Sequence, residues 1–272
     1  MDWSLSLFGS LEWLQFEQVP PKFKSFLNKL CRDEKLPLPK VGIIHDDSPQ
    51  AFTYGRTPHS ARLVLSVGII DLLEKDELEA VVAHEMGHVK HWDFVIMTIA
   101  QLVPILLYHI YRICIDQSKR KKTGNKKNSG EGLVIVAVIA YIFYLLAHYL
   151  VMFISRAREY WADKFSVYYT KNPNSLIFAL TKIGFGLVTT APDKQNEVES
   201  SKQAKTMAIQ AMGIMNIGNS KEIALAFQGD AAAVLNPDVI KQVMRWDLWN
   251  PWATYYELQS THPLTAKRIN AI

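Results

Sequence analysis

Val81-Val82-Ala83-His84-Glu85-Met86-Gly87-His88 contains two histidines four residues apart, with a glutamate directly after the first. On an α-helix, side chains four residues apart lie on the same face, with Cβ atoms roughly 5–6 Å apart. Two imidazole nitrogens can then bind one Zn²⁺ ion at about 2.0–2.1 Å. Glu85 lies one step round the helix, beside the metal, where it can accept a proton from a bound water. The stretch therefore predicts a helix that supplies two zinc ligands, His84 and His88, and a general base.

Two apolar segments of membrane-spanning length follow these histidines. Residues 94–115 are interrupted by few polar side chains, and residues 133–154 contain no Asp, Glu, Lys or Arg. Because a helix of about 20 apolar residues spans a bilayer, we expect a transmembrane hairpin and a multi-pass protein of the cell membrane. The alternative is a helical hairpin buried inside a soluble protein.

Residues 116–132 connect the two apolar segments and carry six of the chain's positive charges. This composition predicts a flexible loop. Since the formal net charge of the whole chain is +4, the rest of the chain is slightly acidic, and we expect no nucleic-acid partner. The positive-inside rule would place the loop in the cytoplasm and the catalytic face on the opposite side.

The N-terminal part predicts a small sheet of three strands, at residues 40–45, 50–55 and 61–66, separated by turn residues. A free edge of such a sheet can bind an extended peptide through main-chain hydrogen bonds, although an ordinary structural edge is an equal alternative. Residues 3–16 have apolar side chains at helical spacing and predict a short amphipathic helix.

Asp76 and Glu79 resemble a capping box, which predicts the start of the helix that carries the two histidines. No strong helix breaker separates this helix from Phe94, where the first apolar segment begins. We therefore expect the helix to run on towards the membrane and the metal site to lie close to the membrane surface.

A catalytic zinc ion usually takes three protein ligands and leaves one position open. His91 is seven residues from His84, about 10.5 Å along a helix axis, which is too far for both to bind one ion. Glu159 is the better candidate, because a hairpin would return it to the membrane face from which His88 departs. Asp163 lies one turn later on the same face, where it can hydrogen-bond a histidine ligand.

His262 and Arg268 form a positive pair near the C-terminal end that could bind the oxyanion formed when water attacks a peptide carbonyl. We interpret the histidines in the predicted strands, turns and spans as structural: His45, His59, His109 and His148. A different chemistry is also conceivable, since Glu85-x-x-His88 fits half of a di-iron motif for a membrane oxidoreductase. The second half of that motif is absent from the sequence.

Four motifs in this order resemble metallopeptidase family forty-eight, the group of bacterial HtpX and the CAAX prenyl endopeptidase. They are His84-Glu-Met-Gly-His88, Glu159-Tyr-Trp-Ala-Asp163, Ser260-Thr-His-Pro263 with Arg268, and Gln50-Ala-Phe-Thr-Tyr54, where Gln50 replaces the family's Asn. The resemblance runs from about Pro21 to the end of the chain. Relatives usually carry further spans before the catalytic domain, so we expect this chain to be shortened.

The resemblance implies a membrane-embedded zinc endopeptidase of the gluzincin type, with one Zn²⁺ per chain bound by His84, His88 and Glu159. It implies that Asp163 buttresses a histidine ligand and that His262 and Arg268 assist the transition state. The expected partners are the lipid bilayer and polypeptide substrates, namely membrane or misfolded proteins in quality control. Members are usually described with a cytoplasmic active site, opposite to the orientation that the basic loop favours. The alternative is an inactive relative that serves as a membrane interaction module.

The fold class that follows is α+β and mostly helical: a zincin-like catalytic domain with a small three-stranded sheet and an inserted transmembrane hairpin. Residues 1–93 would form the first part of the catalytic domain and residues 155–272 the second part. The hairpin at residues 94–154 would separate them. The expected substrate-binding residues are those of the edge strand: Gln50, Ala51, Phe52, Thr53 and Tyr54.

Overall fold

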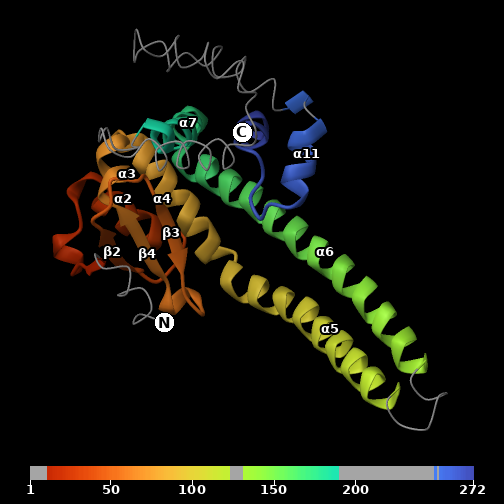
Figure 1. The fold of residues 1–272 in the computed structure, drawn as a ribbon. Helices are drawn as coiled ribbons and strands as arrows, with labels where there is room; N and C mark the ends of the chain where they lie inside the picture. The colour runs from red at the N-terminus through yellow and green to blue at the C-terminus, as the bar shows by residue number, and fades with distance from the viewer. Residues whose placement is uncertain (1–10, 123–130, 190–247, 250) are drawn as a thin grey trace, which may run out of the picture.

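The computed structural model describes residues 11–122, 131–189, 248–249 and 251–272. It shows a mostly helical α+β fold in which a sheet and several helices form one body, and two long helices extend away from it (Figure 1). The regular elements are β1 (Leu11–Trp13), α2 (Pro21–Asp33), β2 (Lys40–Ile44), β3 (Ala51–Tyr54), β4 (Arg62–Ser66), α3 (Val67–Leu72), α4 (Lys75–Lys90), α5 (Asp93–Lys122), α6 (Glu131–Thr170), α7 (Pro173–Thr189), α11 (Pro251–Leu258) and α12 (Thr265–Ala271).

The sheet has four described strands in the order β1-β2-β4-β3, so the prediction of three strands was wrong. The missed strand is β1, which pairs antiparallel with β2, whereas we expected a helix over residues 3–16. Of that range, residues 1–10 lie outside the described part of the chain. The physical reason for the strand is tertiary: the side chains of Leu11 and Trp13 cover Gly42, where a Cβ atom would lie only 2.9–3.0 Å from them.

The core lies between the sheet and helices α2 and α4. Phe23, Leu27 and Leu30 form one buried face of α2, and α4 contributes Leu78 and Val82, all with no exposed surface. The i, i+4, i+7 spacing on α2 is that of a helix with one apolar face. This packing fixes α4 against the sheet, so the histidines of α4 have a rigid support.

The helix α4 begins and ends differently from the sequence prediction. Its capping contact joins Glu74 and Glu77, whose carboxylate accepts the Glu74 N–H at 2.8 Å, rather than Asp76 and Glu79. It also does not run on into the apolar segment but ends at Lys90. Trp92 then adopts a φ of 58°, a left-handed conformation that stops a right-handed helix. The turn redirects the chain, and α5 begins at Asp93.

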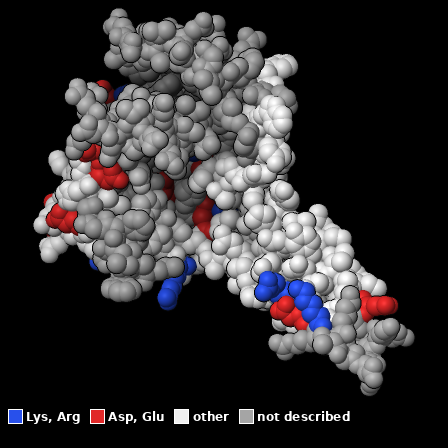
Figure 2. Space-filling view, in the orientation of Figure 1, with Lys and Arg blue, Asp and Glu red and all other residues white. Residues whose placement is uncertain are grey.

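Helices α5 and α6 pack side by side as the predicted hairpin (Figure 1). Both are longer than the apolar segments, and α5 reaches Lys122, so the predicted flexible loop was wrong for residues 116–122; residues 123–130 lie outside the described part. Within the described residues, only 6% and 11% of the most apolar windows of the two helices are buried. The hairpin is therefore not a buried core element. On the face seen in Figure 2, its charged side chains gather toward the end farther from the body.

Candidate active site

A close crossing of α4 and α6 brings the predicted metal ligands together. At the crossing stands Gly87, where a Cβ atom would lie 3.2 Å from the Cα of Ala162 and 3.1 Å from the ring of Phe165. One turn further along α6, the buried Ser166 hydroxyl donates a 2.6 Å hydrogen bond to the carbonyl of Ala80 on α4. A side chain at position 87 would push the helices apart, so the glycine within the His-Glu-x-x-His stretch has a packing role.

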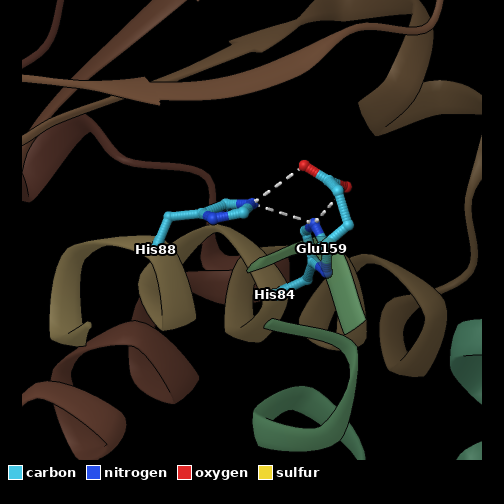
Figure 3. Close-up of side chains that lie close together, drawn as sticks. All are labelled: His84, His88 and Glu159. Carbon is cyan, nitrogen blue, oxygen red and sulfur yellow. Dashed lines mark hydrogen bonds and ion pairs between the residues drawn. The ribbon is translucent and has the colours of Figure 1, made fainter. Parts of the chain in front are cut away.

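His84, His88 and Glu159 converge at this crossing and point toward one another (Figure 3). The Nε2 atoms of the two histidines are 3.2 Å apart, and each lies 3.6 Å from a carboxylate oxygen of Glu159. A tetrahedral ion that binds its ligands at about 2.0–2.1 Å requires ligand atoms roughly 3.3 Å apart. The spacing of the three donors therefore fits a zinc ion. Their chemical type, two imidazoles and a carboxylate, fits zinc as well.

A carboxylate holds the other nitrogen of each histidine. The Nδ1 of His84 lies 2.9 Å from Asp163, and the Nδ1 of His88 lies 2.5 Å from Asp93. When Nδ1–H donates to a carboxylate, Nε2 keeps its lone pair for a metal and the ring is fixed in orientation. Asp163 was expected in this role. Asp93 was missed, although its position five residues after His88 becomes a signal once a turn is known to separate α4 from α5.

The two aspartates are themselves held by arginines. Arg268 on α12 donates through Nε and Nη2 to both oxygens of Asp163, at 2.8 and 2.6 Å, and its Nη1 lies 3.3 Å from Glu159. Arg158 on α6 forms an ion pair with Asp93. The guanidinium of Arg268 is thus brought to the site, where its donors face the carboxylates of Asp163 and of the ligand Glu159.

His262 approaches from the other side, with a side chain that is 69% exposed and an Nδ1 atom 3.3 Å from Glu159. Arg156 on α6 fixes the segment before it by donating to the carbonyls of Glu257 and Ser260. The hydrogen bond to Glu159 raises the pKa of His262 above its usual value, although partial burial opposes this. A positively charged imidazole can therefore stand at the mouth of the site.

The carboxylates of the site are stabilised in their charged form. Burial alone would raise the pKa of Glu159, but the hydrogen bond from His262 and the neighbouring His84 and Arg268 hold it well below the usual range. Burial would likewise raise the pKa of Asp163, and the hydrogen bonds from Arg268 and His84 lower it on balance. Both groups are therefore anionic at neutral pH, which is the state that binds a cation.

Glu85 faces a cleft of about 590 Å³ between the edge strand β3 and the helices α4, α6 and α7. Its carboxylate accepts a 3.0 Å hydrogen bond from the hydroxyl of Thr53. Of the expected substrate-binding residues, Gln50, Ala51, Phe52 and Thr53 line the cleft. Tyr54 does not line it, and its ring packs near those of Trp13 and Phe52 instead.

The histidines set aside as structural lie away from the three ligands. His45 pairs with Glu12 at the surface, and His148 stacks on Tyr144 in the hairpin. His91 lies edge-on to the rings of Trp161 and Phe165 on α6. These contacts explain the residues without a metal.

Comparison with known proteins agrees with this geometry. The model of Peptidase family M48 matches residues 17–272. The Protease HtpX homolog of Methanothermobacter thermautotrophicus is 33% identical over 186 residues, which cover 68% of this chain and 67% of that protein. Protease HtpX homolog 2 of Methanosarcina acetivorans is 32% identical over 178 residues, or 65% of this chain and 60% of that protein.

Among solved structures, the crystal structure of S. mikatae Ste24p superimposes with a TM-score of 0.50 at 19% identity. It covers 98% of this chain and 52% of the Ste24p chain. This likeness concerns the fold. The chain spans about half of that protein and about two thirds or less of the two HtpX homologs.

Proposed function

The chain belongs to peptidase family M48 as an HtpX-like metallopeptidase, and we propose that it is a membrane-embedded zinc endopeptidase whose general base is Glu85. The observation that carries the proposal is the convergence of His84, His88 and Glu159 beside the Glu85 carboxylate, at the wall of one cleft. Two ligands and a base on one helix, with a third ligand from a second helix, are the parts that this reaction needs.

A bound zinc ion would polarise the scissile carbonyl and lower the pKa of a water molecule to about 7. His84, His88 and Glu159 would hold the ion, one per chain. Asp163 and Asp93 fix the two imidazole rings from behind, through the contacts at Nδ1. The protein's contribution here is orientation of its own donors, which outer carboxylates typically provide.

Glu85 performs the proton transfers. Its carboxylate accepts a proton from the attacking water and then delivers it to the nitrogen of the departing amine, as a general base and then a general acid. Its position beside the three ligands, buried but open to the cleft, suits this exchange. The acid of the second step is the conjugate of the base of the first, so no further proton donor is needed.

His262 and Arg268 stabilise the negative charge that develops on the carbonyl oxygen. His262 lies at the exposed side of Glu159, where a charged imidazole can donate to an oxyanion. Arg268 acts from behind, because its guanidinium is bonded to Asp163 and lies beside Glu159. We assign His262 the direct contact and Arg268 the positioning of the ligands together with a favourable field.

An extended polypeptide would bind along the cleft-lining part of β3, from Gln50 to Thr53. β3 is an edge strand of the described sheet, because among the described strands it pairs only with β4. Addition of a strand to such an edge gives affinity through main-chain hydrogen bonds and tolerates many sequences. This tolerance suits substrates that are misfolded proteins.

A hairpin that spans a bilayer would bring this cleft close to the membrane, and membrane proteins are the substrate class we propose. Glu159 follows the apolar segment 133–154 by five residues, or about 7.5 Å of helix. On the other helix, Phe94 and Met97 line the cleft and also belong to the first turns of α5. A polypeptide segment that emerges from the membrane would therefore lie next to the cleft. Such a substrate is consistent with a role in membrane-protein quality control.

The test is the substitution Glu85→Gln, with Glu79→Gln on the same helix as the matched control. We expect Glu85→Gln to retain about one zinc per chain and to lose at least 10²-fold in the rate of casein or peptide cleavage. Glu79→Gln should keep both zinc and rate, because Glu79 pairs with Lys75 away from the cleft. Undiminished cleavage by Glu85→Gln would overturn the assignment.

Metal analysis of the same samples separates the alternatives. One zinc per chain supports the peptidase, whereas two irons would support a di-iron oxidoreductase. Zinc binding without cleavage of any polypeptide by the wild-type chain in its membrane would instead indicate an inactive relative that serves as an interaction module.

A further inference from the structure

Thr53 touches the proposed general base directly. Its hydroxyl lies 3.0 Å from Oε2 of Glu85 and 3.3 Å from the main-chain carbonyl oxygen of the same residue. A hydroxyl has a single proton to donate, and the carboxylate is both the nearer and the charged acceptor. The proton is therefore directed at Glu85, whose carboxylate has one oxygen bonded to β3 and the other available to the cleft.

The pairing of β3 with β4 determines which main-chain groups of β3 remain available. The N–H of Ser66 donates to the carbonyl of Gln50 at 2.9 Å, and the N–H of Gln50 donates to the Ser66 hydroxyl, also at 2.9 Å, so the main-chain groups of Gln50 point toward β4. The register continues through Phe52 with Val64, and hydrogen-bonded pairs alternate along antiparallel strands. The N–H and C=O groups of Ala51 and Thr53 consequently point away from β4, toward the outer edge of the described sheet.

Thr53 thus takes part in both expected functions of the cleft, which are peptide binding and proton transfer. Its main chain belongs to the outer edge that an extended peptide would pair with, and its side chain lies on the α4 face and bonds the base. We propose that Thr53 is a positioning residue: it holds the Glu85 carboxylate in the orientation for proton transfer and ties that orientation to the strand on which substrate docks. This role rests on the proposed function of Glu85.

The simplest test compares two substitutions that differ in the hydroxyl. Thr53→Val keeps the β-branched shape and removes the hydrogen bond, whereas Thr53→Ser keeps the hydroxyl and loses only a methyl group. Groups that orient catalytic residues typically contribute 10- to 100-fold. We therefore expect Thr53→Val to lower kcat about 10- to 100-fold with little change in KM, and Thr53→Ser to stay within about threefold of wild type.

A structural contact would behave differently from a positioning residue. If Thr53→Ser loses as much activity as Thr53→Val, or if Thr53→Val keeps the wild-type kcat, the inference is wrong. A loss that appears in KM alone would also overturn it, because the substrate is expected to contact the main chain of Thr53 rather than its hydroxyl.

Two further measurements keep the result interpretable. Zinc content and melting temperature of each variant show whether the fold is intact, and Thr53→Ala provides a second variant without a hydroxyl, compared per zinc-loaded molecule. In the inactive Glu85→Gln background, binding of an uncleaved peptide should be unaffected by Thr53→Val. Failure of the proposed function would show as cleavage by Glu85→Gln itself, whereas failure of this inference alone would leave Glu85→Gln inactive and Thr53→Val fully active.

Discussion

The catalytic body and the hairpin use the same kinds of residue in opposite ways. Phe23 and Leu78 in the body have no exposed surface, whereas Leu106 and Leu146 in the hairpin are each 60% exposed. In the body, apolar side chains leave water by packing on one another. In the hairpin they face outward, which is stable where lipid takes the place of water. The difference shows that composition alone does not separate a core from a membrane surface; the partner of each apolar face does.

The metal site lies where these two regions meet. α6 belongs to both, since it carries the uncharged run of the hairpin and then Glu159 and Asp163 in the body. The ligand helix α4 belongs to the body alone. Substitutions in each region should therefore have separable effects, and four predictions test this separation.

The largest contrast is expected from side-chain truncation. Phe23→Ala removes a fully buried ring and should lower the free energy of unfolding of the body by about 3–5 kcal/mol. Leu106→Ala removes an exposed side chain and should change it by less than about 0.5 kcal/mol. Denaturant unfolding followed by tryptophan fluorescence, in one detergent, measures both. Equal losses would mean that the hairpin packs into the body.

A lysine placed in each region should have its larger effect in the hairpin, on membrane insertion, and little effect in the body. Leu106→Lys puts a cation near the middle of α5, and an insertion cost of about 2.5–3.5 kcal/mol is typical at a helix centre. Leu38→Lys, at a 48% exposed position of the body, should leave insertion unchanged. The carbonate-resistant membrane fraction reports the result. Full insertion of Leu106→Lys would argue against a lipid-facing position.

The carboxylates behind the histidines should matter for metal binding in a graded way. Asp93→Asn and Asp163→Asn remove a charge that fixes His88 and His84, and each should weaken zinc binding about 10- to 100-fold. Asp116→Asn, at an exposed position of the hairpin, is the control and should have no effect. Competition with a chelator of known affinity measures the change. If only Asp163→Asn has an effect, the contact across the α4–α5 turn is dispensable.

The smallest effect concerns Cys31, a buried cysteine of the body. Burial raises the pKa of the Cys31 thiol to about 12, so the folded state keeps the proton up to that pH while the unfolded chain loses it near 9. The contribution of Cys31 to stability is therefore present below about pH 9 and is lost as pH rises toward about 12. At pH 8, Cys31 in the native body should resist iodoacetamide and react only after unfolding. Mass spectrometry of labelled peptides measures this, and rapid labelling of Cys31 in the native state would contradict it.

The sequence predicted the ligands better than their surroundings. His84, His88 and Glu159 follow from helical spacing and from the hairpin that returns the chain, both of which are regular patterns. Asp93 could not be predicted in its role, because its contact depends on a left-handed residue at Trp92 that no spacing rule indicates. The β1 strand was missed for a related reason: the apolar spacing of residues 3–16 fits a helix, and pairing with β2 over Gly42 decides otherwise.

The continuity of α6 gives the site a mechanical property. From Glu131 to Thr170 the helix is unbroken, whereas the path from His88 into α5 has a joint at Trp92. Transmembrane helices tilt to match the thickness of a bilayer. A tilt would be transmitted directly by α6 to Glu159, whereas on the α4 side it meets the change of direction at Trp92 and reaches His88 only through the contact with Asp93. The thickness of the bilayer would then affect the position of Glu159 more directly than the positions of His84 and His88. Zinc affinity compared in bilayers of short and long acyl chains would measure the size of this effect.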